Sequence, residues 1–177
     1  MNRSHLALIT ASILLSGPTI AGSDHVPQAY EGSAEFKAIK KLQGHWEGTG
    51  DQKNEKGIPL LVRADYKVSS GGRAVIETLF AGSPHEMVSV YFDEGGKLAM
   101  THYCLLPNQP HMTLKNATPD EIVLAVGNNG NVDPMSDHMD AVTLSIPAAD
   151  NLIETWQSVE GGKPGKTVVI TLTKKSS

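Results

Sequence analysis

A histidine and a thiol lie two residues apart in a segment with the pattern of a β-strand. His102 and Cys104 fall within residues 98–106, and side chains two apart point to the same face of a strand. Imidazole and thiolate are good ligands for zinc, copper or haem iron, and His138 is a third candidate ligand. The alternative is structural, because free cysteines are often core residues and buried histidines are often hydrogen-bonded. A haem or transition metal held by His102, Cys104 and His138 is therefore one expectation.

A single carboxylate interrupts an apolar run earlier in the chain. Glu77 shares a strand face with Val75 and Leu79, so it enters the core if that face is buried. A carboxylate inside a barrel has a raised pKa or pairs with an arginine such as Arg63 or Arg73. Glu77 is a candidate anchor for a ligand; the alternative is a solvent-facing residue on one strand.

Four further residues are candidates for contact with a ligand. Tyr91 and Trp156 are expected in the core or in the wall of a cavity. Asn108 and Gln109 precede Pro110, which forces Gln109 into an extended conformation at the rim of the fold. Their carboxamides either hydrogen bond to a ligand or satisfy the backbone of their own loop, and we favour the second role.

The elements that position these residues are predicted to be short antiparallel strands. Ser33 caps a helix that ends before Gly44, and a longer loop at 128–140, containing His138, is expected to hold one helical turn. Closing ten consecutive strands into an up-and-down barrel removes both exposed sheet edges, so we predict an all-β barrel, with a β-sandwich as the alternative. The predicted strands are 45–52, 59–69, 74–81, 87–93, 98–106, 111–117, 121–127, 141–147, 152–159 and 167–174.

The first predicted strand carries a Gly-x-Trp pair in the run from Leu42 to Gly50, which also contains Gly48. With the short helix and ten strands, this run resembles the opening of nitrobindin-like barrels, which belong to the calycin group with the lipocalins. The chain is also similar to secreted bacterial DUF1579-like proteins of unknown function. The resemblance implies an interior ligand, with Trp46 plugging the base. Nitrobindin-like proteins hold haem through a histidine on a late strand; here the last two predicted strands contain none, which leaves His102 or His138.

The N-terminus has the pattern of a secretory signal peptide. A short charged segment precedes an apolar run, and a small-x-small site predicts cleavage after Ala21 and a secreted or periplasmic protein. The apolar run is too short to span a membrane. Residues 22–33 are expected to form a flexible leader, and residues 34–175 a single barrel domain.

The net charge restricts the possible partners, and the cysteine content restricts how the fold can be stabilised. The formal net charge of −4 becomes −5 when residues 1–21, with Arg3 as their one charged residue, are removed. A mildly acidic chain argues against a nucleic-acid partner. A single cysteine excludes an intramolecular disulfide, so the fold depends on its core.

These observations favour a secreted barrel that binds a small apolar or amphipathic molecule. One alternative is a haem or metal protein using His102. The other is an enzyme with an acid–base pair formed by Glu77 and either His102 or His138. The sequence shows no Ser-His-Asp order, nucleophile elbow or phosphate-binding loop, so an enzyme is the less favoured hypothesis.

Overall fold

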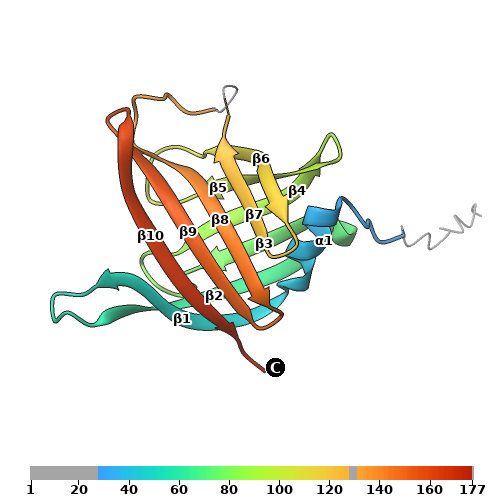
Figure 1. Cartoon of the computed structure of the whole chain (residues 1–177), viewed down its shortest axis with the longest axis horizontal. Coiled ribbons are helices and arrows are strands. Elements are labelled where there is room, and N and C mark those ends of the chain that lie inside the picture. Colours follow the sequence, from blue (N-terminus) through green and yellow to red (C-terminus); the bar gives the residue numbers. More distant parts are fainter. Residues whose placement is uncertain (1–27, 128–130, 177) are drawn as a thin grey trace, which may run out of the picture.

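The computed structural model describes residues 28–127 and 131–176, so the predicted signal peptide lies outside the described residues. The chain forms a closed ten-stranded antiparallel barrel with one short α-helix, which confirms the predicted barrel and excludes the sandwich (Figure 1). Each strand pairs with the next, and β1 pairs with β10. The elements are α1 (Ala34–Lys41), β1 (Gly44–Lys53), β2 (Pro59–Ser69), the 3-10 turn η1 (Ser70–Gly72), β3 (Ala74–Leu79), β4 (Met87–Glu94), β5 (Lys97–Tyr103), β6 (His111–Thr118), β7 (Glu121–Val126), β8 (His138–Ala148), β9 (Asn151–Glu160) and β10 (Lys163–Lys174). No helix in these ranges is long and apolar enough to cross a membrane.

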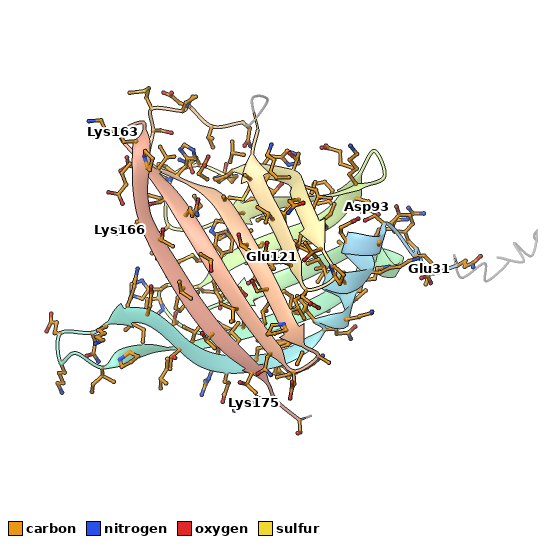
Figure 2. All side chains as sticks on the ribbon, in the orientation of Figure 1. Glu31, Asp93, Glu121, Lys163, Lys166 and Lys175 are labelled. Carbon is orange, nitrogen blue, oxygen red and sulfur yellow. The ribbon has the colours of Figure 1, made fainter. Side chains whose placement is uncertain are left out.

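One end of the barrel is covered by α1, and we call it the helix end (Figure 1). Ser33 caps α1 by accepting a hydrogen bond from the Phe36 amide at 3.1 Å, and its hydroxyl donates to Asp93 of β4 at 2.7 Å. Asp93 lies beside the helix in Figure 2. Phe36 and Ile39 are buried, and the buried Trp46 indole donates a 2.7 Å hydrogen bond to the Leu42 carbonyl. The helix, its cap and the first strand therefore close this end together.

The opposite end carries the β1–β2, β3–β4, β5–β6, β7–β8 and β9–β10 connections, and we call it the loop end (Figure 1). A hydrogen-bonded tie joins three of these connections. The Asn108 side-chain amide donates to the Asp137 carbonyl at 2.8 Å, and the Gly161 amide donates to the Asp137 carboxylate at 2.8 Å. Three connections at this end are thus held together by polar contacts, whereas the helix end is covered by the buried face of α1.

The seam between β1 and β10 depends on a glycine. Gly48 pairs with Leu172, and a Cβ atom at position 48 would lie 1.8 Å from the Thr171 carbonyl oxygen. A contact that short is impossible without moving the backbone, so only glycine fits. Gly48 therefore allows β1 and β10 to pack closely at this position.

Three strand boundaries differ from the predicted ones by three or more residues. Strand β5 ends at Tyr103 rather than at residue 106, so Cys104 lies in the β5–β6 connection. Strand β8 begins at His138, which is not a loop residue, and residues 131–137 form turns and bends instead of a helical turn. Strand β10 begins at Lys163 because Gly161 and Gly162, with φ of 56° and 76°, allow a tight turn that the predicted longer loop did not include.

Candidate functional site

A row of polar side chains crosses four adjacent strands inside the barrel. Tyr66 of β2 is opposite Glu77 of β3, Glu77 is opposite Ser89 of β4, and Ser89 is opposite His102 of β5. Directly opposed residues in an antiparallel sheet share a face and lie about 5 Å apart at their Cβ atoms. All four are buried, so the row points into the interior. The prediction that Glu77 shares the buried face with Val75 and Leu79 is confirmed.

Hydrogen bonds hold this row to its neighbours. The Tyr91 hydroxyl donates to Glu77 Oε2 at 2.8 Å. Ser89 Oγ and His102 Nδ1 are 3.0 Å apart and share one hydrogen bond. The predicted pairing of Glu77 with an arginine is wrong, because its partner is Tyr91, whereas Arg63 contacts Glu47 on the outer face.

A second set of polar groups comes from β9 on the opposite wall. The Tyr66 hydroxyl donates to Glu154 Oε1 at 2.8 Å, and the Trp156 indole donates to Glu154 Oε2 at 2.9 Å. The rings of His102 and Trp156 have centroids 4.5 Å apart. The two walls therefore meet across the lumen in a single cluster. We call it the polar cluster: Tyr66, Glu77, Ser89, Tyr91, His102, Glu154 and Trp156.

Burial dominates the electrostatics of the polar cluster. It raises the pKa of Glu77 well above its ordinary value, and the charge of Glu154 raises it further. Burial also raises the pKa of Glu154, whose two hydrogen bonds from Tyr66 and Trp156 act in the opposite direction. Both tyrosine pKa values are raised by burial and by the neighbouring carboxyl groups. The pKa of His102 is lowered to about 4 by burial, so its imidazole is neutral at physiological pH.

Two atoms of the polar cluster are left without a hydrogen-bond donor. Glu77 Oε1 and His102 Nε2 are fully enclosed and receive no hydrogen bond from a described N–H or O–H donor, and the Glu77 carboxyl group is hydrogen-bonded to that of Glu154 through its own proton. Leaving a buried polar atom unsatisfied costs about 1–3 kcal/mol. Each other polar side-chain atom of the cluster has a hydrogen-bond partner among the described residues, so the deficit is confined to these two.

The remaining predicted site residues lie elsewhere. Asn108 ties the loop end together through its amide, although its Oδ1 is buried without a described partner. Gln109 is exposed, and Cys104 is half-buried beyond the end of β5. Asn108 therefore bonds to the backbone of another connection rather than to that of its own loop, and Cys104 does not share a strand face with His102.

His138 is buried on the outer side of the barrel wall. It is opposite Val159, which shares a face of β9 with the exposed Gln157. Its Nδ1 is 2.7 Å from the Ser136 carbonyl and its Nε2 is 3.6 Å from Asp140. His138 lines a surface hollow of about 690 Å³ at the loop end, to which no residue of the polar cluster contributes.

The three predicted metal ligands are not brought together. His102 faces the interior, His138 lies on the outer side, and Cys104 is in a connection. Within residues 28–127 and 131–176, no three histidine, cysteine, aspartate or glutamate side chains form a group that could hold a metal ion.

Sequence reasoning missed Tyr66, Ser89 and Glu154. The alternation Leu152, Glu154, Trp156 contained the signal for Glu154, because these residues share one strand face and two of them are apolar. Ser89 and Tyr66 had no comparable signal, because their roles depend on the register between strands.

Comparisons with known proteins bear on the fold. No family model and no curated protein sequence matches this chain. The structure is similar to Rv2717c from M. tuberculosis, with 16% identity and a TM-score of 0.57 over 82% of this chain and 99% of that one. It is also similar to a protein of unknown function from the DUF3598 family of Nostoc punctiforme PCC 73102. That match has 12% identity and a TM-score of 0.55, and covers 77% of this chain and 49% of the other. At these identities the likeness shows a shared barrel fold.

Proposed function

We propose that the lumen binds a small apolar or amphipathic molecule whose polar end hydrogen bonds to Glu77 Oε1 and His102 Nε2. The observation that carries the proposal is the pair of buried, unpartnered atoms inside an otherwise satisfied cluster. A ligand that supplies both missing hydrogen bonds would recover part of the cost of burying these groups.

The chemistry of the surrounding side chains supports an amphipathic guest. Met100 lies two residues before His102 on the same buried face of β5, and Trp156 packs against the imidazole. A few polar atoms within apolar and aromatic walls are typical of small-molecule sites. The resemblance of the Leu42–Gly50 run to calycin barrels supports the same class of function.

The loop end is the expected entrance. The helix end is closed by α1 and by Trp46, whose indole is hydrogen-bonded to Leu42. His102 lies one residue before the end of β5, so it is close to the loop end. Opening the loop end requires breaking the two hydrogen bonds to Asp137, and exposed hydrogen bonds are readily exchanged for water. This costs less free energy than separating the buried face of α1 from the barrel.

Native mass spectrometry of protein purified from its own source tests this function directly. We expect a co-purifying small molecule, which the His102→Leu variant loses and the His111→Gln variant keeps. His111 is a matched control because it lies on the neighbouring strand with its side chain near Glu94 on the outer face. A ligand-free protein that also fails to bind any member of a panel of small alcohols and amines would refute the proposal.

A haem or metal site is a second candidate, favoured by one observation. His102 is neutral near pH 7, its Nδ1 is held by Ser89, and its Nε2 has no described partner, so His102 would supply one protein ligand to such a group. The other two predicted ligands, Cys104 and His138, cannot join His102 in one site because they lie outside the polar cluster. Such a group would supply visible absorption, and a colourless, metal-free sample purified from its own source would remove this candidate.

An acid–base enzyme is the third candidate. Glu77 and His102 lie in one row with Ser89 between them, so the predicted Glu–His combination is brought into the same cluster. The lowered pKa of His102 suits a base, and the raised pKa of Glu77 suits an acid. Turnover of a bound native ligand, abolished by Glu77→Gln, would favour catalysis over storage.

We also propose that the protein is exported from the cell interior. The charged start, apolar run and small-x-small site of residues 1–21 support secretion or delivery to a periplasm. The mass of the mature protein tests the cleavage, because removal after Ala21 leaves a chain that begins at Gly22.

A further inference from the structure

The lumen contains acids and no basic side chain to balance them. The buried polar and charged residues of the described ranges are Glu77, Ser89, His102, His138 and Glu154, and none is a lysine or arginine. His102 cannot serve as the cation near neutral pH, because burial lowers its pKa to about 4. A buried carboxylate without a cation is costly, so two of them on facing walls need an explanation.

The hydrogen bonds distinguish the two acids. Glu154 receives a donor on each oxygen, from Tyr66 and from Trp156, which suits the charged carboxylate. Glu77 receives one donor, from Tyr91, and its Oε1 receives none. The two carboxyl groups are also hydrogen-bonded to each other, so the pair is arranged to hold one negative charge, favoured on Glu154, and one removable proton, favoured on Glu77.

The two acids are also connected in space. Tyr66 is directly opposite Glu77 across the β2–β3 pair, and its hydroxyl reaches Glu154. The free Nε2 of His102 belongs to the same cluster, because the imidazole packs against Trp156, whose indole is bonded to Glu154. This unpartnered, fully enclosed nitrogen is the independent sign that the acids form a site for a ligand.

We propose that the ligand is a small primary amine, held as its ammonium ion by the carboxyl groups of Glu77 and Glu154 and by the Nε2 of His102. This inference rests on the proposed function. An ammonium group has three N–H donors, and the polar cluster offers three acceptors: Glu77, Glu154 and a neutral imidazole. The rings of Trp156, Tyr66 and Tyr91 add favourable contacts to a cation. A carboxylate ligand meets two acids and no cation, and is excluded by repulsion.

Binding of an amine is expected to release a proton from the polar cluster, which can be measured. An alkylamine is charged near neutral pH, as a lysine side chain is, so it enters already protonated. The Glu77 carboxyl group then loses its proton to solvent as its oxygens take up the ammonium hydrogen bonds. Binding of one amine therefore releases up to one proton, because the raised pKa of Glu77 keeps its carboxyl group more protonated in the free protein than beside the ammonium ion.

Isothermal titration calorimetry with hexylamine, hexanol and hexanoate tests the inference on the full-length mature protein. Two buffers that differ in their enthalpy of protonation report the number of protons released. We expect hexylamine to bind at least about tenfold more tightly than hexanol, and hexanoate not to bind. We expect proton release with hexylamine and none with hexanol.

Two variants separate this site from general apolar binding. Glu77→Gln keeps a polar group of the same shape but has no proton to release. In this variant we expect hexylamine to bind no more tightly than hexanol and to release no proton. Hexanol should still bind. Glu154→Gln is a second variant in case the first fails to fold, and we expect the same loss of amine preference. The wild-type proton count needs neither variant.

The outcomes distinguish the two proposals. Hexanol binding without a preference for hexylamine overturns the amine assignment and leaves the proposed function intact. Binding of hexanoate with the highest affinity also overturns it. Failure of all three probes to bind, together with a ligand-free native protein, overturns both.

Discussion

The helix end and the polar cluster both contain buried side chains, but they satisfy their polar groups differently. At the helix end the Trp46 indole and the Ser33 hydroxyl have partners at 2.7 Å, and the surrounding core is apolar. The polar cluster holds two carboxyl groups and leaves Glu77 Oε1 and His102 Nε2 unpartnered. The first arrangement lowers the free energy of folding, whereas the second raises it. A costly interior is expected where the cost is recovered in binding or chemistry, so the proposed function assigns stability and binding to different parts of one barrel.

The largest expected difference between these regions comes from Trp46→Ala. Removing a buried indole leaves a cavity and a free Leu42 carbonyl, so we expect unfolding in urea to show a loss of about 3–5 kcal/mol. Leu61→Ala is the control, because Leu61 is 84% exposed and its truncation should change stability by less than about 0.5 kcal/mol. Equal effects of the two substitutions would contradict the role of the helix end.

The second prediction concerns the pH dependence that His102 gives the polar cluster. Its pKa falls from 6.5 to about 4 on folding, so the stabilisation is complete above pH 6.5 and is lost as the pH falls toward 4. The full loss amounts to about 3 kcal/mol, at 1.36 kcal/mol for each pKa unit. His102→Gln should remove this part of the acid destabilisation in chemical unfolding curves recorded across that range. If the variant and the wild-type protein lost stability in parallel, His102 would not be buried as described.

A smaller effect is expected at the cap of α1. Ser33→Ala removes the hydrogen bonds to the Phe36 amide and to Asp93, and should cost about 1 kcal/mol in urea unfolding. Ser69→Ala is the matched control, because Ser69 precedes the 3-10 turn η1 without a side-chain capping bond. A loss at Ser69 as large as that at Ser33 would mean that capping does not explain the effect.

The smallest effect on stability is expected at the loop end. Asn108→Ala breaks the tie to Asp137 but also removes an unpartnered Oδ1, so the net change should be below about 1 kcal/mol. If the loop end is the entrance, the variant should exchange hexanol about two- to fivefold faster in NMR line-shape measurements. Gln109→Ala, which changes the exposed neighbouring residue, should leave exchange unchanged.

The fold could be predicted from the sequence because its signals are local. Alternation and turn residues located all ten strands, and Glu77 was assigned correctly to one strand face with Val75 and Leu79, although whether that face is buried stayed open. The site was predicted only in part. Glu77, Tyr91, His102 and Trp156 meet in the polar cluster, whereas Cys104 and His138 do not. Which side chains meet across the lumen depends on register and bulges, such as the one between Met139 and Ala141, and a single sequence does not encode these locally.

Gly48 has a consequence for how copies of this protein behave toward one another. Any larger residue would push β1 and β10 apart at Thr171, and we expect the pairing that closes the cylinder to be lost around that point. Part of two strands of 10 and 12 residues would then present unpaired backbone groups to other molecules. A glycine at this one position is therefore expected to protect the protein from association through its own sheet edges.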